Sequence, residues 1–251
     1  MNDQRSTAAS FRGSLVVPFF LAVSAPIAVF FGIKILRSVW WTFAMYQGAI
    51  CLLAPAIESR LEGRGWREHA VMLGLLQAPE NRVPVRRWLL PSVILGSMTA
   101  LVTAGFLILT RHRYLDPDHL NATLAGWGVS PERVPAMLGF MAMLDAAAEE
   151  LFWRGYFPGR VALTRPDRNR SIVLTVFLPS VLYASYHAVT IRGLVGATGG
   201  VVILTGGVLA AGLLWGWLRW RTGSVWPSLL SHGGAVLAYL GVHLWLTSGR
   251  H

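Results

Sequence analysis

The sequence predicts an all-α protein, a polytopic transmembrane helix bundle with about seven spans. Hydrophobic residues make up 54% of its 251 residues and charged residues only 14%, against roughly 25% charged residues in a typical soluble domain. Apolar runs of about 20 residues, the length that crosses a bilayer as a helix, recur along the whole chain. This composition excludes an ordinary water-soluble globule and a disordered tail protein.

The spans follow one another with short connections. The first is expected at 15–35 and is followed at once by a second at 39–57, so the first is an uncleaved span and not a secretory signal. Residues 58–87 are charged and contain Gly and Pro, and their one apolar patch, 71–76, is too short to cross and predicts an interfacial segment. The remaining spans are expected at 88–110, 135–157, 171–190, 194–218 and 225–246.

The net charge of +10 predicts the orientation of the chain in the membrane. The arginines lie between the apolar runs, a pattern that favours a topology signal over a nucleic-acid surface, and we expect membrane lipid but no nucleic acid as a partner. Of the 22 Lys and Arg residues, 15 fall on the side of the N-terminus and 7 on the other side. Because cytoplasmic loops are enriched in Lys and Arg, we expect a multi-pass protein of the cell membrane with a cytoplasmic N-terminus.

Two sequence features concern packing and redox chemistry. Gly212-x-x-x-Gly216 in the sixth span predicts close approach of two helix backbones. Cys51 is the single cysteine, which excludes an internal disulfide and predicts a small buried side chain.

Titratable side chains occur inside three of the last four spans. The fourth span contains Asp145, Glu149 and Glu150, the fifth contains His187, and the seventh contains His232. An ionisable group costs about 2.5–3.5 kcal/mol at the centre of a membrane helix, so such groups usually mark a functional site. A second histidine of the seventh span, near the end of the chain at position 243, is expected at the membrane interface.

Helix geometry divides the roles of the two adjacent glutamates. Glu150 and Arg154 are four residues apart and can pair along one face. Glu149 is turned about 100° away from Glu150, so it can face a cavity and exchange a proton with water. Asp145 either supports Glu149 or lines the same cavity.

A carboxylate and two imidazoles from separate helices leave two mechanisms open. Glu149, His187 and His232 could bind Zn²⁺ with an open position for water, or they could activate water without a metal. The spacing places the two histidines at different depths in the membrane, because His187 lies about 16 residues into its span and His232 only a few residues into its own. Either Pro179 breaks the fifth helix, or that helix continues past residue 190.

Three ordered motifs in the last four spans resemble the CPBP family of intramembrane proteases, which includes the type II CAAX prenyl endopeptidases and the bacterial Abi, or bacteriocin-processing, proteins. The first motif, E-E-x-x-x-R, is present from Glu149 to Arg154. The second, F-x-x-x-H, ends at His187 but begins with Tyr183. The third, H-x-x-x-N, begins at His232 after a closely matching Gly223-Ser-Val-Trp-Pro segment, but ends at Val236. The resemblance covers about 135–246.

The resemblance implies an intramembrane endopeptidase that hydrolyses a peptide bond of a membrane-associated substrate, in CAAX-type or other C-terminal or leader processing. By position, Glu149 would activate the water, Glu150 and Arg154 would order the site, and His187 and His232 would hold or polarise the water, directly or through a metal. If the family Asn stabilises the oxyanion, Val236 cannot do so, and Ser231 or a backbone N–H would have to replace it.

Two other functions remain open at this point. An inactive membrane scaffold or immunity protein could keep the same fold, which the departures at Tyr183 and Val236 would allow. A proton-coupled transporter would use the same buried charges as a proton path, but it predicts inverted repeats that the sequence lacks. We divide the chain into an N-terminal transmembrane region, 1–134, and a catalytic transmembrane core, 135–251.

Overall fold

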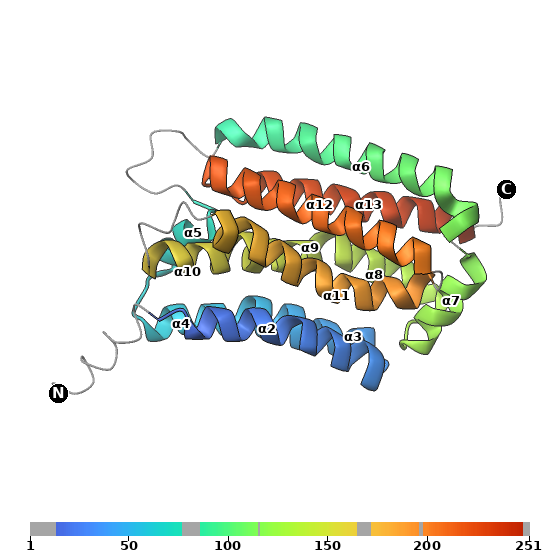
Figure 1. Ribbon diagram of the computed structural model, residues 1–251, viewed down its shortest axis with the longest axis horizontal. Helices are drawn as coiled ribbons and strands as arrows, with labels where there is room; N and C mark the ends of the chain where they lie inside the picture. The colour runs from blue at the N-terminus through green and yellow to red at the C-terminus, as the bar shows by residue number, and fades with distance from the viewer. Residues whose placement is uncertain (1–13, 77–85, 115, 165–171, 196–197, 248–251) are drawn as a thin grey trace.

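The computed structural model describes residues 14–76, 86–114, 116–164, 172–195 and 198–247, and these residues contain helices but no strands. The long helices lie side by side in one bundle (Figure 1). The predicted all-α helix bundle is therefore confirmed.

Six helical segments are long and apolar enough to cross a membrane, and they match six of the seven predicted spans. Their ranges are Val16–Ile35, Val39–Leu61, Arg87–Arg111, Val173–Val195, Thr198–Thr222 and Trp226–Leu246. The first residue of the predicted fifth span, 171, lies outside the described residues. The predicted fourth span also forms a long helical segment, 134–164, but it does not meet the same criterion because it carries five charged residues.

The first two spans form a pair of antiparallel helices. The first consists of α2 (Val16–Phe30) and a π-helical turn (Phe31–Ile35). The second consists of α3 (Val39–Thr42), a π-helical segment (Phe43–Leu53) and α4 (Ala54–Leu61). Ser38 caps α3, because its hydroxyl accepts a hydrogen bond from the Trp41 amide.

The central helical segment carries the acidic motif. It begins with α8 (Val134–Phe140) and ends with α10 (Phe157–Thr164). Between them, α9 (Ala146–Glu150) is flanked by two π-helical turns, Met141–Asp145 and Leu151–Tyr156. Such π-helical turns within α-helices are frequent at functional sites.

The last three spans complete the bundle together with the third. A π-helical turn (Val173–Phe177) leads into α11 (Leu178–Val195), which is followed by α12 (Thr198–Thr222) and α13 (Trp226–Thr247). Helix α6 (Arg86–Tyr114) packs along α13, and α12 packs along α11. Figure 1 shows α6 beside α12 and α13 at one edge of the bundle and the first two spans at the opposite edge.

The predicted glycine pair of α12 lies at a helix contact. A Cβ atom on Gly212 would lie 3.3 Å from the Ser180 side chain, and one on Gly216 would lie 3.0 Å from Val176. Both neighbours belong to the fifth span, so these glycines permit the close approach that the sequence predicted. Cys51 is buried, as expected.

Two short helices close the ends of the bundle. Helix α5 (Trp66–Leu73) lies beside α10 at one end, and α7 (Pro117–Gly126) lies at the other (Figure 1). The interfacial segment predicted at 71–76 therefore forms the end of α5 and the turn after it. Asp116 caps α7, because its carboxylate accepts hydrogen bonds from the amides of Asp118 and His119.

Helix α5 is held tightly against the central segment. A Cβ atom on Gly155 would lie 2.9 Å from the Leu73 carbonyl oxygen, and one on Gly159 would lie 2.6 Å from that of Met72. The Arg219 guanidinium donates to the Met72 carbonyl at 3.0 Å and to the Arg154 carbonyl at 2.9 Å. Helix α5 thus closes the end of the bundle that follows the acidic motif along the central segment.

A buried ion-pair cluster reinforces the same end. The fully buried Arg160 guanidinium donates two 2.8 Å hydrogen bonds to the Glu62 carboxylate and lies 3.2 Å from the Glu58 carboxylate. Tyr156 donates a 2.5 Å hydrogen bond to Glu58. These contacts join the end of the second span to α10.

Candidate active site

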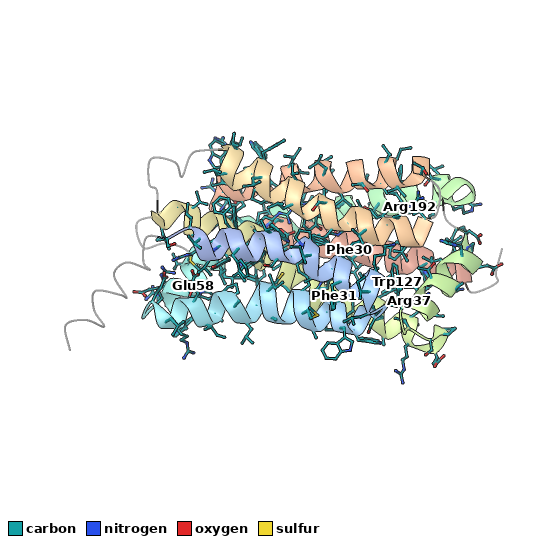
Figure 2. All side chains as sticks on the ribbon, turned by 60° about the horizontal axis from the view of Figure 1, so that its bottom comes forward. Phe30, Phe31, Arg37, Glu58, Trp127 and Arg192 are labelled. Atoms are coloured by element: carbon teal, nitrogen blue, oxygen red, sulfur yellow. The ribbon has the colours of Figure 1, made fainter. Side chains whose placement is uncertain are left out.

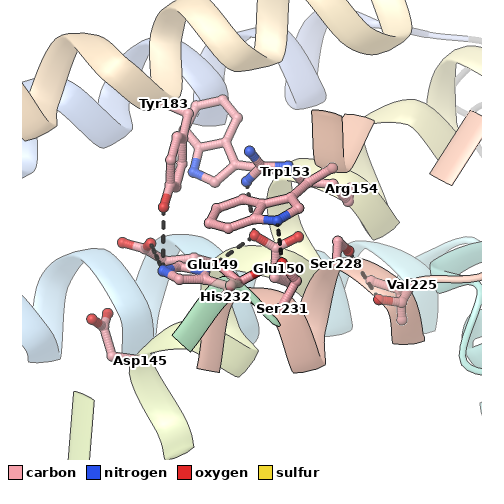
Figure 3. A network of polar contacts seen from close by, with 12 residues as sticks. Asp145, Glu149, Glu150, Trp153, Arg154, Tyr183, Val225, Ser228, Ser231 and His232 are labelled. Carbon is pink, nitrogen blue, oxygen red and sulfur yellow. Dashed lines mark hydrogen bonds and ion pairs between the residues drawn. The ribbon is translucent and has the colours of Figure 1, made fainter. Parts of the chain in front are cut away.

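The acidic motif and the last histidine motif meet in the middle of the bundle. His232 Nε2 lies 3.9 Å from the Glu149 carboxylate, and His232 Nδ1 lies 3.2 Å from Glu150 Oε1 (Figure 3). All three side chains are buried. The imidazole therefore lies between two carboxylates from the central segment, one on each ring nitrogen.

Arg154 fixes Glu150 on the side away from the cavity. Its guanidinium donates a 3.0 Å hydrogen bond to Glu150 Oε1, and both groups are completely buried. The guanidinium also lies over the Tyr183 ring at 4.3 Å and near the Trp215 ring at 5.2 Å. A buried charge needs such pairing, so the Glu150–Arg154 pair predicted from the spacing forms a rigid base for the site.

Tyr183 brings a hydroxyl group to the histidine. Its Oη lies 3.3 Å from His232 Nε2, on the nitrogen that faces Glu149. Trp215 stacks on the other side of the imidazole, with ring centroids 4.7 Å apart and planes 23° apart. The Trp215 indole donates to the Ser231 hydroxyl at 2.9 Å, and Ser231 is also bonded to Thr99 at 2.7 Å. Ser231 is thus occupied by structural hydrogen bonds.

His187 lies one helical turn beyond Tyr183. Its Nδ1 is 2.9 Å from the Tyr183 carbonyl oxygen, and its ring contacts those of Tyr183 and Tyr186 at 4.4 Å each. Within the described ranges, no hydrogen bond or ion pair joins His187 to Glu149 or His232. Helix α11 is continuous through Pro179 and extends to Val195. The prediction that the fifth helix continues past residue 190 is therefore confirmed.

The site opens into a cavity of about 750 Å³. Glu149, His187 and His232 line it, as do Tyr183 and Val236. Asp145 also lines the cavity, as one of the two predictions for this residue had it, and is hydrogen bonded to Gln47. His243 is also buried, at 2% exposure, and lies near the end of the last span, so its predicted position at the membrane interface stays a prediction.

The cavity extends from the acidic motif toward α7, away from α5. Glu149 and Met137 both line it and are 12 residues apart along the central segment, which corresponds to about 18 Å. Most of the other lining residues are apolar, and they include Leu124 and Trp127 at the α7 end. On the opposite side of the cavity, Val102 of α6 and Ile203 of α12 line it although they are 70% and 47% exposed. The cavity therefore reaches the outer surface of the bundle between α6 and α12.

The side chains do not form a metal site as they stand. Among the described residues, no three His, Cys, Asp or Glu side chains come close enough together to hold a metal ion. His187 Nδ1 contacts a backbone carbonyl and His232 Nδ1 contacts Glu150, which leaves Nε2 as the atom of each ring that faces the cavity. As the described side chains lie, Glu149, His187 and His232 are not gathered around one point, so the predicted ligand set stays a prediction and we derive no step through a metal.

The comparison with protein families agrees with the motifs. The model of the family "Type II CAAX prenyl endopeptidase Rce1-like" matches residues 131–238. Residues 131–238 are thus similar to that family. The matched region begins just before α8 and ends within α13, so it includes every residue of the three motifs. The match confirms the predicted resemblance and supports an intramembrane protease of the CAAX type.

The searches of curated proteins and of solved structures each returned no match. The six apolar helices and the family match together indicate a multi-pass membrane protein. The predicted division at residue 134 stays a prediction, and residues on both sides of it line the cavity, for example Gln47 and Glu149.

Proposed function

We propose that the chain is a membrane-embedded endopeptidase in which Glu149 activates the attacking water. The observation that carries this proposal is the 3.9 Å separation of the Glu149 carboxylate and His232 Nε2 at the wall of an apolar cavity. This separation is too long for a direct hydrogen bond, but one water between the two groups could contact both. A water there would face any peptide bond that lies in the cavity.

In the proposed reaction, Glu149 takes a proton from this water as the oxygen attacks the peptide carbonyl carbon. Glu149 then returns the proton to the amine that leaves. Glu150, held by Arg154, accepts from His232 Nδ1 and keeps Nε2 directed at the water. A carboxylate that orients an imidazole in this way acts as a positioning group, as in other hydrolases.

Tyr183 places a hydroxyl group where it could stabilise the oxyanion. Val236 lines the cavity without a polar atom, and the Ser231 hydroxyl is held by Trp215 and Thr99. The Tyr183 hydroxyl lies beside the proposed water, at 3.3 Å from His232 Nε2, and can donate a hydrogen bond. We assign the oxyanion contact to Tyr183 and a substrate contact to the Nε2 atom of His187.

The cavity favours a substrate that enters from the membrane. Its lining is mainly apolar, it reaches the outer surface between α6 and α12, and α5 closes the opposite end. An extended peptide spans at most about 3.3–3.6 Å per residue, so the 18 Å between Glu149 and Met137 would hold about five residues. We propose a membrane-anchored or membrane-embedded peptide as the substrate, cut in CAAX-type or other C-terminal or leader processing.

The test uses purified protein in liposomes together with a panel of membrane-anchored peptides. We expect the wild type to cleave at least one of them, and Glu149→Gln and His232→Ala to lower the rate by at least 10³-fold. Glu132→Gln, an equivalent change at an exposed glutamate, serves as the matched control and should keep full activity. Equal rates for all four proteins would remove the assignment.

A metal requirement is measured in the same assay. Zn²⁺ stays a prediction from the sequence, and the side-chain geometry favours hydrolysis by the residues alone. We expect full activity after dialysis against a chelator. Loss of activity that returns with Zn²⁺ alone would contradict this expectation.

A further inference from the structure

A second cavity, of about 300 Å³, lies near the α7 end of the bundle. Its lining comes from the turn between the first two spans, from α7 and from the end of α11, and it includes Lys34, Arg37, Thr123 and Gly193. Figure 2 shows Arg37 beside Trp127 at this end of the molecule, opposite Glu58. The cavity is separate from the one that holds Glu149.

The charge of this second cavity is unbalanced. Its lining contains two cations and no acidic residue. Where the structure describes the chain, no hydrogen bond or ion pair involves the side chain of Lys34 or Arg37, and both are exposed. The Arg37 guanidinium nevertheless lies over α7, because a Cβ atom on Gly126 would be 3.5 Å from Arg37 Nη2. Such an arrangement suits an anionic group with several oxygen atoms.

The position of this cavity relative to the spans points to a lipid. Lys34 lies at the end of the first span and Arg37 lies just before the second, the level at which lipid headgroups begin. Next to them along the same helices, large apolar side chains are exposed: Phe30 is 50% and Trp41 60% exposed. A headgroup in the cavity would therefore have an apolar surface along which its acyl chains can lie.

Trp127 separates this cavity from the catalytic one. Its side chain lines both, is 8% exposed, and packs so closely on α11 that a Cβ atom on Gly193 would lie 2.4 Å from its ring. Its carbonyl accepts a 3.0 Å hydrogen bond from the Val39 amide. Because this wall is fixed, the basic cavity does not continue the path of a substrate from Glu149, and a lipid fits it better than the end of a peptide.

We propose that Lys34 and Arg37 bind the phosphate of an anionic membrane lipid between the first two spans and α7. The lipid would bridge the α2–α3 turn and α7, the helix that closes the catalytic cavity. Binding would thereby hold α7 in place, together with the contacts of His119 and Thr123 with the Gly193 carbonyl oxygen. Charge-assisted hydrogen bonds between basic side chains and phosphate oxygens support this assignment.

The test is native mass spectrometry of the full chain, purified in detergent and incubated with phosphatidylglycerol, phosphatidylcholine or inorganic phosphate. The test variant is Lys34→Gln combined with Arg37→Asn. Asn is chosen because Arg37 has a φ of 49°, in the left-handed region that Asn tolerates. Arg192→Gln is the matched control, because Arg192 lies at the same end but outside the cavity.

We expect the wild type and Arg192→Gln to retain phosphatidylglycerol in preference to phosphatidylcholine. The double variant should bind phosphatidylglycerol at least about tenfold more weakly than the wild type. Its unfolding temperature should be unchanged. Equal retention of phosphatidylglycerol by all three proteins would overturn the proposal. If inorganic phosphate binds as strongly as the lipid, the cavity is a site for free phosphate. If a copurified peptide is lost only from the double variant, the cavity binds substrate. Either result would overturn the proposal of a lipid site.

Discussion

At the scale of single residues, the Tyr183 hydroxyl offers the sharpest test of the proposed chemistry. Tyr183→Phe removes one oxygen atom and keeps the ring that lies over Arg154. Loss of a single oxyanion donor typically lowers the rate by about 10²–10³-fold. We therefore expect a decrease of this size in kcat for peptide cleavage, with little change in KM and in the unfolding temperature.

The neighbouring Val236 provides the control for this substitution. Asn at this position would place an amide on the cavity wall, one helical turn after His232. If Tyr183 supplies the oxyanion contact, Val236→Asn should restore part of the activity of Tyr183→Phe while adding little to the wild type. A Tyr183→Phe enzyme with wild-type kcat would show that the hydroxyl has no catalytic role.

The Glu150–Arg154 pair is expected to matter for stability as well. Arg154→Met keeps a long side chain but leaves Glu150 as a buried carboxylate without its guanidinium partner. Breaking a buried ion pair from one side costs about 3–5 kcal/mol. We expect a lower free energy of unfolding of this size, measured by denaturation in detergent. Arg133→Met, at an exposed position, should leave it unchanged.

The sequence alone predicted the charged residues of the candidate site but not their aromatic neighbours. Glu149, Glu150 and His232 stand out because ionisable groups are rare within apolar spans. Tyr183 and Trp215 do not stand out, since an aromatic side chain in a membrane helix usually only packs. The departure from Phe at Tyr183 was the available signal for a polar role, and only the 3.3 Å approach to His232 gives it a partner.

At the scale of elements, the docking of α5 depends on the absence of side chains on one face of the central segment. A Cβ atom on Gly159 would approach the Met72 carbonyl oxygen to 2.6 Å, closer than real Cβ contacts. Gly159→Ala should therefore displace α5 and lower the unfolding temperature, although Ala favours a helix over Gly. We expect faster proteolysis within residues 66–76 as the direct measure of the displacement.

Gly139 is the matched position for this test, because it belongs to the same helical segment and a Cβ atom there meets nothing within 4 Å. Gly139→Ala should leave the unfolding temperature equal or slightly higher. Equal protease resistance of the Gly159→Ala and Gly139→Ala proteins would contradict the proposed role of the glycine in docking α5.

The long helices were predictable because their apolar length sets them apart, whereas α7 and the π-helical turns were not. Helix α7 lies in a segment that reads as a polar loop, and only its tertiary contacts with the Gly193 carbonyl oxygen show how it closes the bundle. The π-helical turns around α9 leave no mark in the composition. The central segment was predicted as a span from its apolar run, but its charged residues set it apart from the six apolar helices.

At the scale of the whole molecule, the direction of the cavity makes the membrane orientation decisive for the substrate. The cavity that Glu149 lines extends toward α7, whereas Arg64, Arg67 and Arg219 lie at the opposite end, at or beside α5. If that basic end is cytoplasmic, the cavity extends toward the outer leaflet. A substrate would then approach through the membrane between α6 and α12, and not from the cytoplasm past α5.

Single cysteines can establish this orientation, because the native Cys51 is only 2% exposed and should not react with a membrane-impermeant maleimide. Arg67→Cys on α5 and Ala125→Cys on α7 place exposed thiols at opposite ends of the bundle. In intact cells we expect labelling of Ala125→Cys alone, and after permeabilisation labelling of both. Labelling of Arg67→Cys alone in intact cells would invert the topology, and the cavity would then open toward the cytoplasmic leaflet, where a substrate processed after synthesis in the cytoplasm could reach it.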